Sequence, residues 1–424
     1  MAKKITKSQA KKAAKTAKKH PKIVIAIAVI VLIIVIAAVV LYIVKPDLYH
    51  KYLGIGDHNF DNNGVCTVCG YEKSETGQGN LEDIQEAELS IHFMELGNAN
   101  AGDSTLIKCG DTEVLIDAGS KRNSTRTVKD YIDTYCTDGK LEYVIATHAH
   151  EDHIAALAGE EGKNNGVLYS YEIGTIITFA GHKTNSVVYR DFETAVTYAE
   201  SRGAVRYTAK ECWYEENGAE KQYYLDGDNQ KISLNVLYQK YYDQTTSNEN
   251  NYSVCTLLSQ YINANTTYNY LFTGDLEKAG EESLAESNNL PQCKLFKGGH
   301  HGSSTSSNDV LLSKIRPENI AICTCAGTYE YADKPTAERP ESVAKLNTFP
   351  TQEAIDRMSK YTQNIYVTTL GILNEEYATV RAESMNGNIV FYYKDGKLNL
   401  YCSNNDVILK DTDWFKENRT WTGV

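Results

Sequence analysis

Thr147-His-Ala-His-Glu-Asp-His153 concentrates ligand side chains more densely than any other part of the chain. Its three histidines and one aspartate are His148, His150, Asp152 and His153. The apolar residues 141–147 lead into them and predict a strand. In a tight loop after a strand, the first two histidines can converge on one ion while Asp152 and His153 reach a second. Because imidazole and carboxylate groups together suit Zn²⁺, Mn²⁺ or Fe, the stretch predicts a metal site rather than an ordinary solvated loop.

Two later segments carry groups of the same kind. Residues 271–275, Leu-Phe-Thr-Gly-Asp, form an apolar run that ends in Asp275. A carboxylate at the end of a strand is well placed to bridge two cations. Residues 298–307, Gly-Gly-His-His-Gly-Ser-Ser-Thr-Ser-Ser, put His300 and His301 among small residues. Glycine lets the backbone approach a site closely, so we expect these histidines to join the same metal centre.

The order His-x-His-x-Asp-His, then Gly-Asp, then His-His-Gly-Ser resembles the metallo-β-lactamase superfamily. More narrowly, it resembles the hydrolase domain of ComEC-type competence proteins and their free-standing relatives. Residues 102–104 (Gly-Asp-Ser), 115–119 (Leu-Ile-Asp-Ala-Gly) and 250–253 (Asn-Asn-Tyr-Ser) are similar to further segments of that branch. The resemblance covers roughly residues 89–400. It implies an α/β fold, an αββα sandwich of two packed mixed sheets with outer helices.

The resemblance also implies a role for each motif residue. The two histidines of His-x-His would hold a first metal ion, the following Asp-His pair would hold a second, and Asp275 would bridge the two. His300 is expected to complete the second metal site. His301 would then lie near the leaving group, as a ligand or a proton donor. Asp152 and His301 are therefore the residues expected to act catalytically.

Three further residues are expected to contact a ligand or the substrate, namely Asp117, Asn251 and Ser303. Asp117 at a strand end suits a hydrogen bond to a ligating histidine. The implied cofactors are two divalent ions, Zn²⁺ or Mn²⁺, which lower the pKa of bound water towards neutrality and supply a hydroxide nucleophile. Two ions ~3.5–4 Å apart can clamp the oxygens of a phosphodiester during in-line displacement.

The chain departs from the superfamily pattern at three places. The opening segment, residues 96–103, is longer than the usual one. Residues 347–350, Asn-Thr-Phe-Pro, stand where relatives often have a histidine before the proline. Many members place a histidine of the first metal site ~20 residues before the bridging aspartate, where this chain has Asn250 and Asn251. His182 is an upstream candidate, although a surface loop explains it more simply. The first metal site is therefore expected to be weaker, or completed by water.

The charge of the chain is divided unevenly. The 424 residues carry a formal charge of -12, but residues 1–22 hold nine lysines and no acid, which leaves 34 basic against 55 acidic residues in the rest. Residues 23–44 carry no charge, and such a helix spans the ~30 Å core of a bilayer. They predict a single-pass signal anchor rather than a cleaved signal peptide. The positive-inside rule then puts the N-terminus in the cytoplasm and everything after Lys45 outside the cell membrane.

Residues 45–88 resemble a stalk between this anchor and the hydrolase domain at 89–400, which a C-terminal extension, 401–424, follows. His58, Cys66 and Cys69, with His50 upstream, suit a small structural zinc knuckle, since Zn²⁺ takes four nitrogen or sulfur ligands. A Cys66–Cys69 disulfide or free thiols are the alternatives. For the other eight cysteines, buried free thiols are the simplest interpretation.

Outside the motifs, apolar patterns and turn signals predict a layered α/β body. Expected strands cover residues 89–96, 106–116 as a hairpin that turns at 110–111, 141–147, 232–238, 253–261, 268–273 and 365–369. Expected helices cover the surroundings of Tyr131, 191–202, 308–315 and 351–361, and a last hairpin turns at 394–396. The helix at 308–315 is expected to have Ser306 or Ser307 as its N-cap.

The sequence therefore favours a membrane-anchored, extracytoplasmic hydrolase that cleaves phosphodiesters. The ComEC-like branch points to DNA or nucleotides. The acidic body argues against a long polyanion, since nucleic-acid binders normally carry a basic footprint. A small phosphodiester, such as phosphorylcholine on a cell-wall polymer, is an alternative substrate. A non-catalytic surface binding protein with structural metals is a second hypothesis. β-Lactam hydrolysis is a third, which the His-His-Gly-Ser context disfavours.

Overall fold

The computed structural model describes residues 81–160, 162–328, 348–374 and 379–424. All of them belong to one unit of the chain, Thr76–Val424. The anchor predicted at residues 23–44 and the knuckle predicted at His58, Cys66 and Cys69 lie outside the described residues and stay predictions. Within the described ranges, no helix combines the length and the apolar character needed to cross a membrane.

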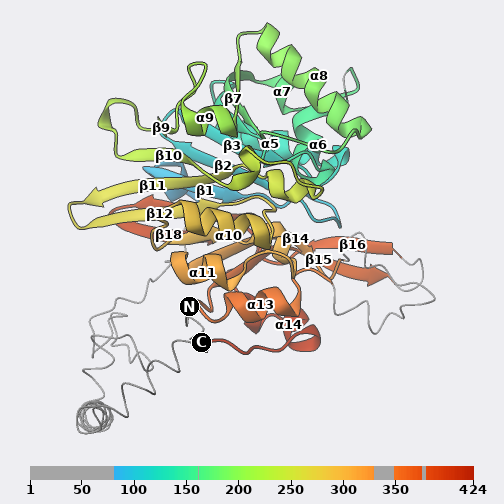
Figure 1. The fold of residues 1–424 in the computed structure, drawn as a ribbon. Coiled ribbons are helices and arrows are strands. Elements are labelled where there is room, and N and C mark those ends of the chain that lie inside the picture. Colours follow the sequence, from blue (N-terminus) through green and yellow to red (C-terminus); the bar gives the residue numbers. More distant parts are fainter. Residues whose placement is uncertain (1–80, 161, 329–347, 375–378) are drawn as a thin grey trace, which may run out of the picture. The chain divides into compact units, whose positions relative to one another are not determined.

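Two mixed sheets of eight strands each form the centre of this unit (Figure 1). The first sheet contains, in spatial order, β18 (Lys397–Cys402), β17 (Ile389–Lys394), β1 (Leu89–Phe93), β2 (Ser104–Cys109), β3 (Thr112–Ala118), β4 (Lys140–Ile145), β7 (Glu172–Thr178) and β8 (Val205–Thr208). The second contains β16 (Thr379–Ser384), β15 (Ile365–Asn374), β14 (Asn319–Ala326), β13 (Leu295–Lys297), β12 (Thr266–Phe272), β11 (Cys255–Asn263), β10 (Ile232–Leu237) and β9 (Gln222–Tyr224).

Helices cover the outer face of both sheets (Figure 1). Over the first sheet lie α5 (Thr125–Tyr135), α6 (Glu151–Ala158), α7 (Val167–Ser170) and α8 (Val187–Ser201). Over the second lie α10 (Lys278–Ser287), α11 (Asp309–Ile315), α13 (Gln352–Met358) and α14 (Asp413–Asn418). The described residues also form α4 (Leu81–Gln85), α9 (Ala209–Tyr214), a small hairpin of β5 (Gly159–Glu160) and β6 (Asn164–Asn165), and several short 3-10 helices. This order of helix, sheet, sheet and helix confirms the predicted αββα sandwich.

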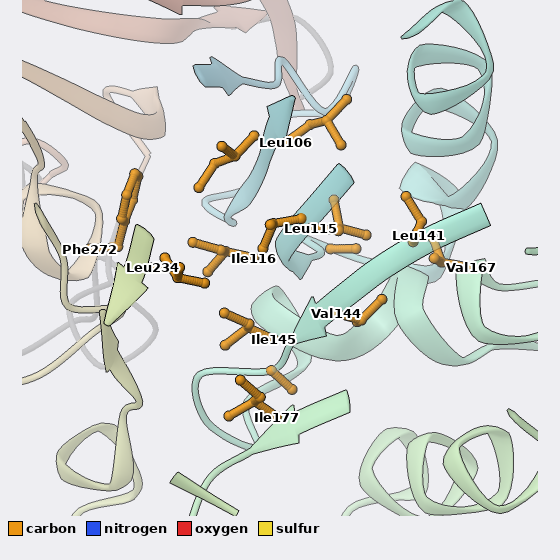
Figure 2. Close-up of a cluster of buried hydrophobic side chains, with 14 of the residues drawn as sticks. Leu106, Leu115, Ile116, Leu141, Val144, Ile145, Val167, Ile177, Leu234 and Phe272 are labelled. Carbon is orange, nitrogen blue, oxygen red and sulfur yellow. The ribbon is translucent and has the colours of Figure 1, made fainter. Parts of the chain in front are cut away.

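Apolar side chains gather in two clusters, one between the sheets and beneath α5 to α8, the other between the second sheet and its own helices. Figure 2 shows Ile116, Ile145 and Ile177 of the first sheet pointing toward Leu234 and Phe272 of the second. None of these five side chains is more than 4% exposed. Burying one such side chain is worth ~1.5–3 kcal/mol, so these contacts hold the two sheets against each other. The ends of strands from both sheets are thereby kept close together.

Most of the expected elements are confirmed. The strands predicted at 232–238, 253–261 and 268–273 are β10, β11 and β12. The hairpins predicted to turn at 110–111 and 394–396 join β2 to β3 and β17 to β18. The eight cysteines of the described residues are free thiols, as expected, and burial raises the pKa of each.

The predicted N-cap of α11 was wrong, because Asn308 holds that position instead of Ser306 or Ser307. The hydroxyl of Ser306 donates to the carbonyl oxygen of Leu276 (2.8 Å). The buried carboxylate of Glu281 accepts the backbone N–H groups of Ser307 (2.6 Å) and Asn308 (2.8 Å). Glu281 of α10 thus accepts backbone N–H groups just before α11, where a serine side chain was expected to act as the cap.

His92 on β1 makes the stability of the fold depend on pH. Its fully buried ring lies 2.9 Å from the hydroxyl of Tyr131 and 2.8 Å from that of Ser90. Burial, followed by the charge of Lys108, lowers the pKa of His92 from 6.5 to about 3. Below pH 6.5, His92 therefore binds a proton in the unfolded chain but stays neutral in the folded chain. As the pH falls, the free energy of unfolding then decreases by up to about 1.4 kcal/mol per pH unit. In urea titrations with chelator present, we expect the free energy of unfolding of His92→Asn to fall less between pH 6.5 and 5 than that of the wild type. An equal fall in both proteins would contradict this role of His92.

Candidate metal centre

The predicted ligands come together where strands of both sheets end. Asp117 lies near the end of β3, while His148 and His150 follow β4 in the loop before α6. Asp275 follows β12, and His301 follows β13. Because β3 runs parallel to β4, and β12 runs parallel to β13, the two strands of each pair end at the same edge of their sheet.

Four groups form a tight cluster around Asp275. Ligand atoms of Asp152, His153, Asp275 and His301 all lie within 4.8 Å of one another. Oδ2 of Asp275 is 3.0 Å from Nε2 of His153 and 3.3 Å from Nε2 of His301. Oδ2 of Asp152 is also 3.3 Å from Nε2 of His301. Asp152 and His153 belong to the first turn of α6, whereas the sequence suggested a loop.

A further histidine, His148, lies beside the same carboxylate oxygen, and His150 lies next to His148. Nε2 of His148 is 3.9 Å from Oδ2 of Asp275. It is also 3.1 Å from Nδ1 of His150. Two nitrogens at this separation can bind one ion, since a Zn–N bond is ~2.0–2.1 Å long. Oδ2 of Asp275 thus lies in the four-group cluster and 3.9 Å from Nε2 of His148, the ring that contacts His150.

Outer hydrogen bonds fix which nitrogen of each ring faces the cluster. Nδ1 of His153 donates to Oδ2 of Asp117 (2.8 Å), and Nδ1 of His301 donates to a carbonyl oxygen of β14 (2.9 Å). Nδ1 of His148 lies 3.1 Å from the hydroxyl of Thr147. In all three rings Nε2 is left to face the cluster, and such outer partners orient metal-binding histidines.

Asp117 also secures the loop that carries the histidine pair. Its Oδ1 accepts the backbone N–H of Thr147 (2.7 Å), and its Oδ2 accepts the hydroxyl of the same residue (2.7 Å). Gly274 packs against that hydroxyl: its φ is +53°, and a Cβ there would lie 2.8 Å from Thr147 Oγ1. A glycine is therefore required immediately before Asp275.

We expect Asp117→Asn to lower activity about 10–100-fold, the usual cost of changing an outer partner of a metal ligand. The amide cannot accept hydrogen bonds at both of its terminal atoms, so either His153 or Thr147 loses its partner. The measurement is kcat with saturating metal, beside Asp111→Asn in the exposed β2–β3 turn as the control. Equal activity of the two variants would show that Asp117 does not orient the site.

The structure places the two adjacent histidines differently, whereas the sequence predicted that His300 completes the second metal site and that His301 is a ligand or a proton donor. His301, only 1% exposed, is the one that lies in the four-group cluster. Nε2 of His300 is 3.7 Å from Oδ2 of Asp275 and 3.5 Å from Nδ2 of Asn250, and its side chain is 12% exposed. Both residues adopt left-handed backbone, with φ of 47° and 54°, so their rings diverge in a way that sequence spacing did not reveal. His301 is thus placed to complete the second metal site, and His300 lies at its rim.

Other predicted residues lie near the centre without joining the cluster. Oδ1 of Asn251 accepts the backbone N–H of Glu277 (3.3 Å), which ties two loops together. The hydroxyl of Ser303 lies 3.1 Å from that of Thr305, a turn contact. His182 is exposed, and its Nδ1 donates to a nearby backbone carbonyl oxygen (3.1 Å), as a surface loop histidine would.

Asn250 holds the position where many superfamily members carry a histidine of the first metal site. It is 6% exposed, and its Nδ2 donates to Oε1 of Glu277 (3.0 Å). Its buried Oδ1 has no hydrogen-bond partner within the described residues. An amide oxygen can bind a cation, although it is a harder ligand than imidazole and suits Mn²⁺ better than Zn²⁺.

The electrostatics of the centre favour positive charge beside Asp275. Burial lowers the pKa of His153, but the carboxylates of Asp275 and Asp117 raise it more, so that pKa lies well above its ordinary value. The pKa of His301 is raised in the same way, chiefly by Asp275. Burial, together with its histidine neighbours, holds the pKa of His148 well below the ordinary value. The carboxylates therefore favour positive charge at the place where cations would sit.

The donor set fits two divalent ions. Oδ1 of Asp275 and Nε2 of His301 are buried and have no hydrogen-bond partner in the described part of the chain. The carboxylates of Asp103, Asp117, Asp152 and Asp275 meet here, and Lys297 is the buried cation beside them. Uncompensated buried charge costs several kcal/mol per ion. The four carboxylates and the one ammonium together carry three excess negative charges. Two divalent ions would offset these charges and leave one positive charge for an anionic substrate.

Three residues at the centre were not predicted from the sequence to have a functional role. Asp103 was noted only as part of an opening Gly-Asp, and Lys297 was not singled out. Phe349 packs its ring 5.8 Å from that of His301 and 6.2 Å from that of His300, at the place where relatives often have a histidine. Only the fold, which brings β2, β13 and residues 348–350 to one edge, reveals these neighbours.

Residues 97–184 match the family model of the metallo-beta-lactamase superfamily. This segment contains the whole His-x-His-x-Asp-His motif together with Asp117. The match shows that this segment is similar to that superfamily, and together with the ligand cluster it suggests a metal-dependent hydrolase. The ComEC-type branch stays a prediction. A search of curated proteins found no significant match.

Solved structures similar to this chain are distant in sequence. The metallo-beta-lactamase fold protein YhfI from Bacillus subtilis is 11% identical with a TM-score of 0.36, over 66% of this chain and 95% of its own. A metallo-beta-lactamase from Cronobacter sakazakii is 13% identical with a TM-score of 0.27, over 48% and 76%. Metallo-beta-lactamase SMB-1, bound to 2-mercaptoethanesulfonate, is 12% identical with a TM-score of 0.29, over 49% and 79%. The similarity to the superfamily rests on the family model over residues 97–184 and not on these likenesses.

Proposed function

We propose that this protein hydrolyses phosphodiester bonds with two divalent metal ions, which would be held by His148, His150, Asp152, His153, Asp275 and His301. The observation that carries the proposal is the convergence of ring nitrogens on Oδ2 of Asp275. Nε2 atoms of His153, His301, His300 and His148 lie 3.0, 3.3, 3.7 and 3.9 Å from it. A buried carboxylate surrounded by imidazole nitrogens would hold divalent ions.

When bound, two such ions supply an activated water and a positive clamp for phosphate oxygens. The chain's own residues orient that clamp. Asp117 holds the ring of His153, and Asp152 adjoins His301. His300 is the imidazole at the rim, with Nδ1 3.0 Å from the hydroxyl of Thr305. This position suits a group that gives a proton to the departing oxygen.

The charge of the chain supports a small phosphodiester over a long nucleic acid. The part after residue 22 carries 34 basic and 55 acidic residues, and a long polyanion would meet that excess of negative charge. A single phosphodiester needs only the local positive charge of a metal-loaded site. A phosphorylcholine ester on a cell-wall polymer is such a substrate, and DNA or a nucleotide is the substrate that the ComEC-like resemblance implies.

The test uses the full-length chain in detergent, stripped of metal and reloaded with Mn²⁺ or Zn²⁺. Four substrates are compared: bis(p-nitrophenyl) phosphate, p-nitrophenyl phosphorylcholine, labelled single-stranded DNA and a chromogenic β-lactam. We expect cleavage of the two small phosphodiesters that chelator abolishes and metal restores. Cleavage of DNA alone would support the nuclease instead. Metal binding without turnover of any substrate would favour a surface binding protein, and turnover of the β-lactam alone would contradict phosphodiester chemistry.

The proposal includes the membrane anchor at residues 23–44, with the catalytic domain on the outer side of the cell membrane. The uncharged run and the nine preceding lysines support this orientation. Protease added to intact cells is expected to remove the catalytic domain and to spare the N-terminal segment. A full-length chain that resists protease until the cells are lysed would contradict the orientation.

A further inference from the structure

A buried ion pair lies beside the metal centre. Lys297, at the end of β13, has a side chain that is 3% exposed, and its ammonium pairs with the carboxylate of Asp103, which is 4% exposed. Lys297 is the one buried lysine of the described residues. A buried lysine is costly unless it is paired, so its presence here indicates a task that an apolar residue cannot perform.

Both members of the pair reach the predicted ligands. Nζ of Lys297 is 3.7 Å from Oδ1 of Asp275. It is also 3.4 Å from the carbonyl oxygen of Gly274, just before that aspartate. Oδ1 of Asp103 is 3.3 Å from Nδ1 of His301, and its Oδ2 is 3.7 Å from Nδ1 of His153. One ion pair therefore contacts the bridging carboxylate and two ligand rings.

The backbone fixes this pair with respect to the motifs. The N–H of Asp103 donates to the carbonyl oxygen of Asp152 (3.0 Å), and its own carbonyl oxygen accepts the N–H of Gly119 (3.0 Å). Lys297 belongs to the strand that pairs with β12, the strand that leads to Asp275. Neither charged group can move far without shifting the ligand segments.

We propose that Lys297 and Asp103 are positioning residues that determine how Asp275 bridges the two metal ions. The ammonium lies 3.7 Å from Oδ1 of Asp275 and would disfavour a cation at that oxygen, so that Oδ2 would be the oxygen available to the ions. The carboxylate of Asp103 secures the ring of His301. This inference deepens the proposed function and rests on it.

The two oxygens of Asp275 have different surroundings, which supports this division. The ring nitrogens of four histidines face Oδ2. Oδ1 is buried, has no hydrogen-bond partner within the described residues, and faces the ammonium of Lys297. Without that ammonium, both oxygens could chelate the same ion, because carboxylates bind ions through one oxygen or through two. The ion pair thus selects the bridging mode.

The experiment compares the full-length wild type with Lys297→Met, Lys297→Arg and the double variant Asp103→Asn/Lys297→Met. Lys294→Met is the matched control, since Lys294 pairs with Glu318 (2.8 Å), is 26% exposed and lies outside the centre. Metal-free protein is titrated with Co²⁺, whose visible absorption reports coordination geometry. Thermal midpoints of the metal-free proteins and kcat with saturating metal are measured as well. Any cobalt bound by the stalk contributes equally to every variant.

For Lys297→Met we expect an altered cobalt spectrum and a kcat about 10–100-fold lower, with KM little changed. Lys297→Arg should partly restore the wild-type cobalt spectrum and the wild-type kcat. The metal-free midpoint should fall in Lys297→Met and partly recover in the double variant, because removing both charges leaves neither one buried alone. If Lys297→Met does not fold, the spectrum of the double variant decides in the same way.

A wild-type spectrum and kcat in the Lys297→Met or double variant would overturn the positioning role and leave the proposed metal centre intact. A change in Lys294→Met as large as that in Lys297→Met would also overturn it. Failure of the wild type itself to bind cobalt at the histidine cluster would overturn both this inference and the proposed function.

Discussion

Asp275→Asn is expected to abolish hydrolysis, with a fall in kcat of more than about 100-fold. Changing an outer partner of a metal ligand already costs 10–100-fold, and Asp275 is the group around which both sets of ligands meet. Four ring nitrogens face its Oδ2, and the side chain is 1% exposed. An amide carries no charge and is a poor bridge, so the content of bound metal should fall together with kcat.

The measurement is kcat and metal content of the purified variant after equilibration with excess metal. Asp130→Asn is the control, because this aspartate on α5 is 66% exposed and pairs only with Arg126 at the surface (3.4 Å) within the described residues. The control should keep wild-type values. Two bound ions and substantial activity in Asp275→Asn would show that Asp275 is not the bridge.

His301→Ala is expected to weaken metal binding, whereas His300→Ala is expected to lower kcat without loss of metal. His301 is in the four-group cluster, so its removal should weaken metal binding at the second site by more than about 100-fold. His300 is at the rim, so His300→Ala should retain both metal ions. It should lower kcat by about 10²–10⁴-fold if the imidazole gives a proton to the leaving group.

Metal titration by calorimetry separates the two variants, and His182→Ala, in an exposed loop, is the control. A second signature belongs to His300→Ala alone. A substrate with a good leaving group, such as p-nitrophenolate, needs little protonation and should recover most of the lost rate. Loss of metal in His300→Ala and retention in His301→Ala would restore the roles first predicted from sequence.

The ligand set could be predicted because its residues are close together in the sequence. Three histidines and an aspartate within 148–153 leave few chemical alternatives, and the apolar strand before them fixes where they lie. The same reasoning holds for Asp275 at the end of β12. The two-sheet architecture followed from strands that alternate with helices and from the family resemblance.

The distinction between His300 and His301 could not be predicted, because it depends on backbone conformation. Both residues lie in the left-handed region, and a Cβ on the following Gly302 would lie 2.6 Å from Pro350 Cβ. The sequence shows two adjacent histidines, but the turn that directs one into the cluster depends on packing against a segment 50 residues later. The N-cap of α11 was missed for a related reason, since Glu281 reaches it from another helix.

The ion pair of Asp103 and Lys297 shows a different limit of sequence reasoning. Asp103 directly precedes β2 of the first sheet, Lys297 ends β13 of the second, and the two residues lie far apart in the chain. A lysine at the end of an apolar strand ordinarily extends into solvent, so nothing local indicates that this one is buried. Its role becomes visible only when the two sheets place it opposite a carboxylate.

The most direct test of the metal centre is an anomalous-scattering map from crystals of the protein grown with Zn²⁺. We expect two peaks that share Asp275 as a ligand. One should be bounded by His148 and His150, the other by the Asp152–His153 pair and His301. A single peak, or peaks that do not touch Asp275, would contradict a shared two-metal site and with it the proposed chemistry.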